Sequence, residues 1–265
     1  MEWGASSDVS GGLLIDSFRN NRFLYISVIA LLLIVSKVQG QEPCDEEVKL
    51  LLLPTQVLAV VPALQASGET HGRIYFYDTP ALDLLSKGVI LRLREGEEID
   101  LTAKLRPIAS EKVIDPTSEG RGYKCEVDLN DGIENQSYSV ENKYSAAEVP
   151  KTGRELSKLL SKGQKKLIAE SKVKIDWKRV QIVADIKSTI WTAPANPPLD
   201  KLSLELWEWP GGSVLELSTR GAIDTGQVVY RELRELANKN GLGLSSNQHS
   251  KTAIALGGIT GLAPH

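Results

Sequence analysis

Apolar and charged side chains alternate through residues 89 to 106, VILRLREGEEIDLTAKLR. Successive side chains of a β-strand point to opposite faces of its sheet, so this alternation predicts two strands around the turn-like EGEE. One face would carry Arg92, Arg94, Lys104 and Arg106, and the other face almost only hydrocarbon. An antiparallel sheet with one face in water is enough to explain one such hairpin. Other segments have to decide whether the cations face solvent or one another.

The same alternation recurs along the chain. It is found in CDEEVKLLLLP from residue 44, GYKCEVDLN from 122, VQIVADIKSTIW from 180, KLSLELWEW from 201 and SVLELSTR from 213. Helical patterns cover residues 55 to 67, 80 to 87, 152 to 171 and 227 to 239. We therefore expect an α+β domain of mainly antiparallel strands with three or four helices attached.

The charges on these strands are of both signs and are not mixed at random. Acids gather on the first and last strands, whereas bases gather on the middle ones. A barrel that closed around these faces would enclose the cations of Arg92, Arg94, Lys104, Arg106 and Lys187. Enclosed positive charges are costly unless something anionic lies among them. Phosphate is the natural occupant, because Arg offers paired N–H donors and Lys a point charge.

Carboxylates on the same predicted faces supply a second kind of ligand. Asp45, Glu47, Glu205 and Glu216 would offer hard oxygen atoms close to the bound phosphate. Such oxygens suit Mg²⁺ or Mn²⁺, which commonly bridge protein and phosphate. The residues alone therefore predict a site for a metal and a phosphate compound.

Composition argues against other classes of function. The 265-residue chain has a formal charge of −3, so it lacks the global basic field of a nucleic-acid-binding protein. Its three histidines lie at positions 71, 249 and 265 and form no cluster in the sequence. A zinc site or a Ser/His/Asp site is therefore not expected.

The N-terminal residues resemble an export signal. A basic start precedes an apolar run of 13 residues from 23 to 35, and small residues follow at Val38 and Gly40. We expect a signal peptide over about residues 19 to 40, cleaved after Gly40, and a secreted or periplasmic domain over 41 to 265. Residues 1 to 18 would lie upstream of the true start. The run is shorter than the ~20 residues that span a bilayer, which makes an uncleaved membrane anchor the alternative.

The chain contains two cysteines, Cys44 and Cys125. In an exported protein they could form one disulfide across a long loop, or remain two thiols. Sequence does not supply their separation in space, so both alternatives stay open.

The order of these motifs resembles the CYTH domains, or triphosphate tunnel metalloenzymes. DEEVK at 45 to 49 is similar to the family's Glu-x-Glu-x-Lys strand, with Asp for the first Glu. YFYDTPALDLLSKGVILRLRE resembles its Tyr-Asp-Thr helix and Arg-x-Arg strand, and LTAKLR its Thr-x-Lys strand. YKCEVDL is similar to an Arg-x-Glu-x-Glu strand changed to Lys124, Glu126 and Asp128. SLELWEWPGGSVLELSTR, a helix and HSKTAIAL resemble the closing portion of one subgroup, so that the likeness covers about residues 45 to 257.

The resemblance implies a closed eight-stranded antiparallel tunnel with flanking helices that binds a triphosphate compound end-on with Mg²⁺ or Mn²⁺. Members are similar to inorganic, thiamine and RNA triphosphatases and to class IV adenylyl cyclases. The implied catalytic residues are Glu47 and Lys49. The implied phosphate ligands are Arg92, Arg94, Lys104, Arg106, Lys124 and Lys187. The implied metal ligands are Asp45, Glu47, Glu126, Glu205 and Glu216.

The chain departs from this family on its late strands. Where many members carry Glu-x-Glu, Glu205 is followed by Trp207 and Glu216 by Ser218, which argues against a second metal ion. Three functions remain open: a metal-dependent triphosphatase, an exported phosphate or polyphosphate binding module without catalysis, and a structural protein that keeps only the fold. Tripolyphosphate, a nucleotide and a longer polyphosphate would present similar charges to such a tunnel. No nucleic-acid partner is expected.

Overall fold

A computed structural model of the chain describes residues 44–262, except 97, 107–123, 145–147 and 222–223. These residues belong to a compact unit, Gln41–His265, and the predicted export signal lies outside them. None of the helices in the described ranges combines the length and the apolar character needed to cross a bilayer.

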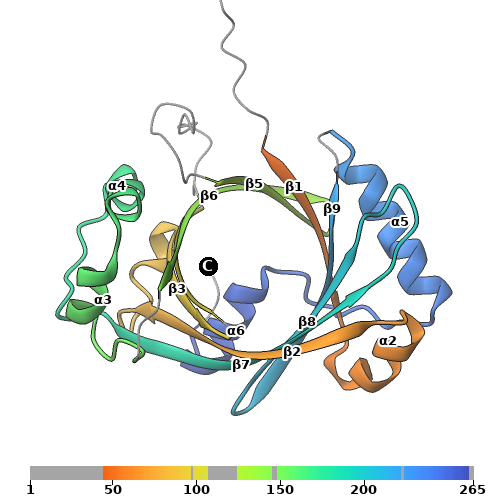
Figure 1. The fold of residues 1–265 in the computed structure, drawn as a ribbon, viewed down its shortest axis with the longest axis horizontal. Coiled ribbons are helices and arrows are strands. Elements are labelled where there is room, and N and C mark those ends of the chain that lie inside the picture. The colour runs from red at the N-terminus through yellow and green to blue at the C-terminus, as the bar shows by residue number, and fades with distance from the viewer. Residues whose placement is uncertain (1–43, 97, 107–123, 145–147, 222–223, 263–265) are drawn as a thin grey trace, which may run out of the picture. The chain divides into compact units, whose positions relative to one another are not determined.

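Nine strands close into one barrel, which Figure 1 shows nearly end-on. They are β1 (Asp45–Leu52), β2 (Ser67–Asp78), β3 (Val89–Glu95), β4 (Ile99–Leu105), β5 (Lys124–Asn130), β6 (Ile133–Tyr144), β7 (Gln181–Ala193), β8 (Leu202–Trp209) and β9 (Gly212–Gly221). The order around the barrel is β1-β5-β6-β4-β3-β2-β7-β8-β9, and β9 pairs with β1. Neighbours are antiparallel except β1 and β5, which are parallel. The closed tunnel is thus confirmed, with nine strands where eight were expected.

The helices pack against two opposite flanks of the barrel and against one of its ends. They are α2 (Val57–Ala63), α3 (Gly153–Leu159), α4 (Lys162–Glu170), α5 (Gly226–Lys239) and α6 (Lys251–Thr260), with short 3₁₀ turns η1 (Pro54–Gln56) and η2 (Leu85–Lys87). The pattern at 152 to 171 predicted one helix, but the chain forms α3 and α4. Thr152 and Ser161 are each the N-cap of a helix and each forms a reciprocal capping box, so two separate helices begin where one was expected.

The helix expected at residues 80 to 87 is wrong. The Asp78 carboxylate accepts hydrogen bonds from the backbone N–H groups of Thr79, Leu84 and Leu85. The segment therefore wraps around this carboxylate as a loop that ends in η2. Gly88 then ends the segment with a φ of +74°, a conformation that glycine adopts without a steric penalty. This loop delivers the chain directly into β3.

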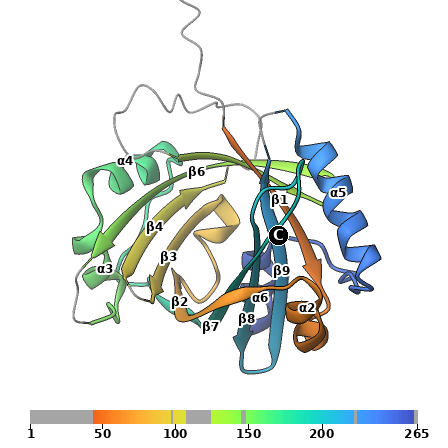
Figure 2. The same cartoon turned by 45° about the vertical axis from the view of Figure 1, so that its right-hand side comes forward.

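The hydrocarbon faces of the strands point out of the barrel and are covered by helices. On one flank, Leu91, Leu93 and Leu101 form a core with Leu156 of α3 and Leu167 of α4. On the opposite flank α5 and α2 cover a second core built on β1, β8 and β9 (Figure 2). The solvent-facing explanation of the hairpin is therefore wrong for its charged face, which points inward.

One end of the barrel interior is filled and the remainder is charged. Phe76, Trp207 and Ile186 point inward and pack with Ala255 and Leu256 of α6 in a third core. Helix α6 thereby closes this end of the barrel. The space left between the strands is a pocket lined by the charged faces.

Candidate active site

The charged pocket has a volume of about 380 Å³ and is lined by inward-facing side chains from most strands and the start of α6. Its basic members are Lys49, Arg92, Arg94, Lys104, Arg106, Lys124, Arg220 and Lys251, and its acidic members are Glu47, Glu126, Asp128, Glu141, Glu205 and Glu216. With eight bases and six acids, this lining favours an anionic ligand.

Three carboxylates form a cluster where β1 and β5 run in parallel. Oxygens of Glu47, Glu126 and Asp128 all lie within 4.8 Å of one another, and the register places Glu47 opposite Asp128. Three convergent carboxylate oxygens fit Mg²⁺ or Mn²⁺. Asp128 was not among the expected metal ligands, whereas Asp45 was. Asp45 is instead an exposed residue 3.7 Å from Arg220 Nη1, outside the cluster.

Asp128 is the most heavily paired member of the cluster. Lys49 Nζ lies 2.6 Å from its Oδ1, and Arg106 Nη2 and Lys104 Nζ lie 3.0 and 3.4 Å from its Oδ2. Burial alone would raise the pKa of Asp128, but these three cations hold it well below its usual range. The carboxyl is therefore ionised at neutral pH, which is the form that binds a metal.

Lys49 is held in its charged form by the same cluster. Its Nζ lies 2.9 Å from Glu47 Oε2 as well as beside Asp128. Burial opposes the charge, but Glu47, Asp128 and Glu216 outweigh burial and raise the Lys49 pKa above its usual value. Lys49 therefore acts as a fixed cation and not as a proton acceptor.

Two arginines on β3 leave hydrogen-bonding capacity unused. Arg92 Nη2 donates to Thr102 Oγ1 at 3.3 Å, and Arg94 Nη2 lies 3.7 Å from Glu205 Oε1. The buried Nε atoms of Arg92, Arg94 and Arg106 have no hydrogen-bond partner among the described residues. Burial and the neighbouring Arg94 lower the Arg92 pKa to about 10. Buried guanidinium groups with unpaired donors are suited to a phosphate ligand.

Lys104 and Lys124 also line the pocket, and both contact Glu126. Burial raises the pKa of Glu126, but Lys104 and Lys124 outweigh burial and bring it to about 2. Lys124 is half-exposed whereas Lys104 is nearly buried, so Lys124 lies toward the mouth of the pocket.

Lys187, an expected phosphate ligand, does not reach the pocket. It is exposed and lies opposite Glu208 on the outer face of the barrel, because Ile186 and Ser188 take the inner face of β7. Both faces of β7 carry apolar residues, so its alternation did not show which face was inside.

Lys251 of α6 is a pocket residue that the sequence analysis missed. Its ammonium pairs with Glu205, lies 2.8 Å from Glu216 Oε1 and sits 4.5 Å from the centre of the Trp207 ring. Glu205 Oε1 also accepts hydrogen bonds from Trp207 Nε1 at 2.7 Å and from Ser188 Oγ at 3.0 Å. The expectation that Glu205 and Glu216 ligate a metal is not supported by this arrangement, because a built-in cation occupies the space between them. The sequence offered one indication of this pocket residue, a single lysine at the start of an apolar helix.

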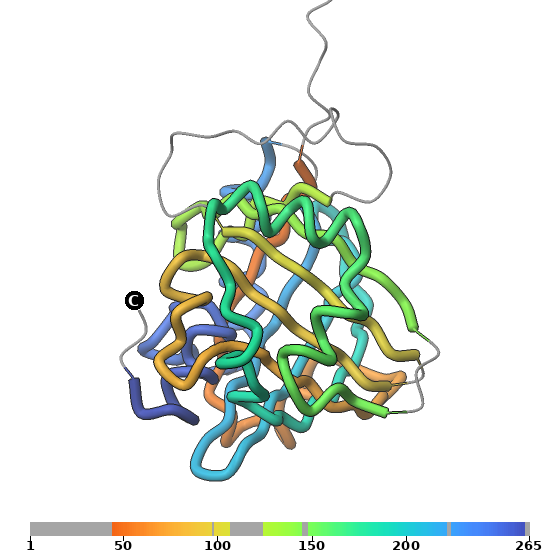
Figure 3. The backbone as a smooth tube through the Cα atoms, turned by 90° about the vertical axis from the view of Figure 1, so that its left-hand side faces the viewer, coloured from red at the N-terminus to blue at the C-terminus, as the bar shows by residue number. Residues whose placement is uncertain are grey.

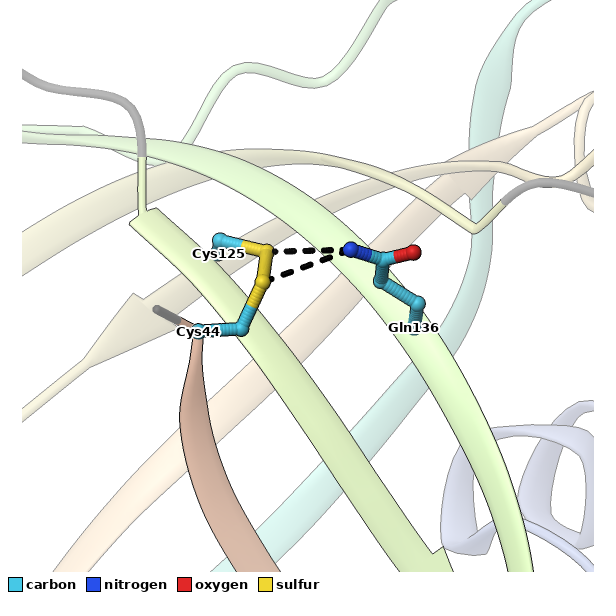
Figure 4. The surroundings of a disulfide bond; sticks show 3 residues. All are labelled: Cys44, Cys125 and Gln136. Atoms are coloured by element: carbon cyan, nitrogen blue, oxygen red, sulfur yellow. Dashed lines mark hydrogen bonds between the residues drawn. A yellow bond between two sulfur atoms is a disulfide. The ribbon is translucent and has the colours of Figure 1, made fainter. Parts of the chain in front are cut away.

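A disulfide joins Cys44 to Cys125 and resolves the open alternative (Figure 4). The two cysteines are 81 positions apart in sequence and directly precede the paired residues Asp45 and Glu126. Gln136 Nε2 lies 3.3 and 3.5 Å from the two sulfurs. The bond therefore fixes the parallel β1–β5 pair on which the acidic cluster is built.

Two solved structures share this barrel. The adenylyl cyclase candidate HpAC1 from Hippeastrum, reported to have a dominant triphosphatase activity, aligns with a TM-score of 0.53 at 19% identity over 78% of this chain and 93% of its own. An adenylate cyclase candidate from Bacillus halodurans aligns with a TM-score of 0.54 at 12% identity over 79% and 96%. The fold is that of the CYTH triphosphate tunnel proteins.

At 19% and 12% identity, the likeness shows the fold and not the chemistry. Comparison of the sequence with family models and with curated proteins found no match. The activity of this tunnel therefore has to be argued from its own residues.

Proposed function

We propose that the chain is a divalent-metal-dependent triphosphatase that hydrolyses the terminal phosphoryl group of a linear triphosphate. The main support for this proposal is that one pocket combines three convergent carboxylates with buried arginines whose Nε donors are unpaired among the described residues. A triphosphate with its metal ion needs both kinds of ligand within a few ångströms.

The basic residues would bind and orient the substrate. Arg92 and Arg94 approach from β3 and Lys104 and Arg106 from β4 and its end, so the phosphate oxygens would meet donors from adjacent strands. Lys49, which its neighbours keep protonated, would stabilise negative charge at the bottom of the acidic cluster. Mg²⁺ or Mn²⁺ bound by Glu47, Glu126 and Asp128 would neutralise phosphate charge and supply Lewis acidity.

Glu47 is the member of the cluster best placed to position the attacking water. Within the described residues its one ion pair is with Lys49, whereas Glu126 contacts two cations and Asp128 three. Its carboxylate is also more exposed to the pocket than that of Asp128. Glu47 therefore retains lone pairs that can accept a hydrogen bond from water.

The second candidate is a phosphate or polyphosphate binding module without catalysis. It is favoured by one observation: Lys251 neutralises Glu205 and Glu216, which leaves one acidic cluster for a metal within the part of the chain that the structure describes. A site with one metal and a built-in ammonium could bind a triphosphate strongly without activating water.

Phosphate release from tripolyphosphate, ATP and long-chain polyphosphate, with Mg²⁺, with Mn²⁺ and with chelator, separates the two candidates. Metal-dependent release would support the triphosphatase, and the preferred compound would name the substrate class. Absence of release, together with a rise in melting temperature on adding tripolyphosphate, would support the binding module. Assay of cyclic AMP in the ATP reaction tests the cyclase activity that we do not expect.

We also propose that the protein is exported through the N-terminal segment. The disulfide supports this proposal, since such bonds persist mainly in oxidising compartments. N-terminal sequencing of the protein recovered outside the cytoplasm tests the cleavage expected after Gly40.

A further inference from the structure

The flank of the barrel formed by residues 151–179 is strongly basic. This segment contains ten of the chain's 31 Lys and Arg residues but only three of its 34 Asp and Glu residues. All ten bases are exposed. The chain as a whole has a formal charge of −3, so this flank, here called the basic face, concentrates positive charge on an otherwise acidic protein.

The basic face is held rigidly by the core beneath it. Leu156 and Leu167 turn the apolar sides of α3 and α4 onto β3, β4 and β6. After α4, Val173 and Ile175 pack against the same core, so that the alternate Lys174 points outward. Figure 3 looks onto this flank, where α3, α4 and the following segment cover the strands.

Most of these bases have no acidic partner. Arg179 Nη2 lies 3.4 Å from Asp83, and Lys166 has an interaction of its own. The other eight bases form no ion pair with any described residue. They are Lys151, Arg154, Lys158, Lys162, Lys165, Lys172, Lys174 and Lys178. Like charges gathered without counter-charges repel one another, and a bound polyanion would relieve this repulsion.

We propose that the basic face is an electrostatic docking surface for an anionic lipid membrane. Clusters of four to eight Lys or Arg residues are sufficient for such docking. The exposed large apolar residues of the described chain are Leu53, Leu58, Ile133, Val228 and Leu262, and none lies on this face. Attachment would therefore be peripheral and would not involve insertion. The apolar run at residues 23 to 35 would bring the same chain to a membrane during export.

Other partners fit the basic face less well. Its one tryptophan, Trp177, is half-buried against the core, so the face lacks the exposed aromatic rings on which single-stranded nucleic acids stack. It also lacks the apolar centre that most protein interfaces contain. A broad, flat, anionic surface matches charges spread over two helices and an extended segment.

Docking by this face would leave the tunnel unobstructed. The basic side chains lie outside the wall formed by β3, β4 and β6, whereas the pocket lies inside it. The inference is therefore independent of the proposed triphosphatase, and each can fail without the other.

Co-sedimentation of the full chain with vesicles tests the proposal. Vesicles of phosphatidylcholine that contain phosphatidylglycerol should bind the protein, and vesicles of phosphatidylcholine alone should bind it much less. The binding that depends on phosphatidylglycerol should fall as salt is raised. The N-terminal segment, whose apolar run has basic residues beside it, is the same in the parent and in the two variants compared below, so its contribution to binding is the same in all three.

A charge-reduced variant and a matched control locate the effect. The variant Lys158→Gln, Lys162→Gln, Lys165→Gln and Lys174→Gln should lower the affinity for phosphatidylglycerol vesicles by roughly 600-fold, since each of the four surface charges contributes about fivefold. The control Lys187→Gln, Lys201→Gln, Arg231→Gln and Lys239→Gln removes the same charge from exposed positions elsewhere. The control should keep its affinity within a few-fold, and both variants should keep the melting temperature of the parent.

Two outcomes would overturn the proposal. Equal losses in the variant and the control would mean that binding follows net charge and not this face. Failure to bind phosphatidylglycerol vesicles would exclude a lipid surface, and binding of soluble polyphosphate or heparin in its place, lost in the variant, would make a free polyanion the partner.

Discussion

Lys251 Nζ lies 2.8 Å from Glu216 Oε1 and also pairs with Glu205, the residue opposite Glu216 across β8 and β9. An ammonium group from α6 thus stands between two carboxylates that could otherwise share a metal ion. Two carboxylates this close cannot both remain ionised and buried without a cation. The helix that closes the tunnel therefore also supplies one of its charges.

Removal of this ammonium group is expected to create a second metal site. Lys251→Ala should lose about 3–5 kcal/mol of stability without metal, because two buried carboxylates lose their partner. Adding Mn²⁺ should restore much of the lost stability. Two Mn²⁺ ions should then bind to each chain of the variant, whereas one binds to the parent. Isothermal titration calorimetry and melting temperatures measure both effects.

The conservative change Lys251→Arg is the control for that experiment. It keeps a cation near Glu205 and Glu216 and should bind one Mn²⁺, as the parent does. Two ions in the parent protein would show that Lys251 moves aside for a metal and would contradict our assignment.

The cluster on β1 and β5 should carry the metal site of the parent. Asp128→Asn removes a ligand charge and should weaken Mn²⁺ binding by at least about tenfold and turnover by about 100-fold or more. Glu205→Gln, which alters a carboxylate outside the cluster, should leave the Mn²⁺ affinity nearly unchanged. Titration of both variants with Mn²⁺ measures the difference, and the opposite ranking would move the site to β8 and β9.

Period-two alternation predicted most of the strands, because their two faces differ in charge, whereas the closed tunnel was implied by the resemblance to the CYTH domains. The strand that was missed is β6, IENQSYSVENKY, where Tyr138 and Val140 are the buried apolar residues of its outward face. Polar residues extend beyond both ends, so the sequence looks like a loop. Pairing with β4 and β5 on its two sides, which sequence does not reveal, makes it a strand.

The site was predicted from strands whose two faces differ and was missed where the faces are alike or the residue comes from a helix. Alternation placed Arg92 and Lys104 inside because the opposite face is hydrocarbon. Alternation failed for Lys187, because the neighbouring Ile186 takes the inner face of β7 and leaves Lys187 on the outer face. It could not find Lys251, since the position of α6 depends on tertiary packing against Trp207 and Phe76.

Arg92 should be required for binding of the triphosphate. Arg92→Ala removes a buried guanidinium group with an unpaired donor, and we expect a loss of about 100-fold in kcat/KM. Lys187→Ala, on the outer face, should retain full activity. The melting shift caused by tripolyphosphate should vanish in the first variant and persist in the second. Near-parental turnover in Arg92→Ala would disprove the proposed tunnel chemistry.

Acid should destabilise the protein partly through Glu205. Burial raises the pKa of this carboxyl, but Lys251 and Arg94 outweigh burial and hold it below the ordinary value of 4.5. Its ionised form therefore stabilises the fold fully above pH 4.5, and this contribution is lost as the pH falls toward the lowered pKa. Urea midpoints measured from pH 7 downward should fall less steeply below pH 4.5 in Glu205→Gln than in the parent. Parallel curves would show that Glu205 is not linked to folding.

The disulfide should stabilise the fold and the metal site together. Its loop of 81 residues implies a loss of about 4 kcal/mol when Cys44 and Cys125 are both changed to Ser, since the unfolded chain is then less restricted. Because the bond fixes β1 against β5, the Mn²⁺ affinity of the Glu47, Glu126 and Asp128 cluster should fall as well. Urea titration and calorimetry measure the two losses. Dithiothreitol should weaken the parent and leave the double variant unchanged. A loss of stability with full Mn²⁺ affinity would mean that the parallel strand pair holds its register without the covalent bond.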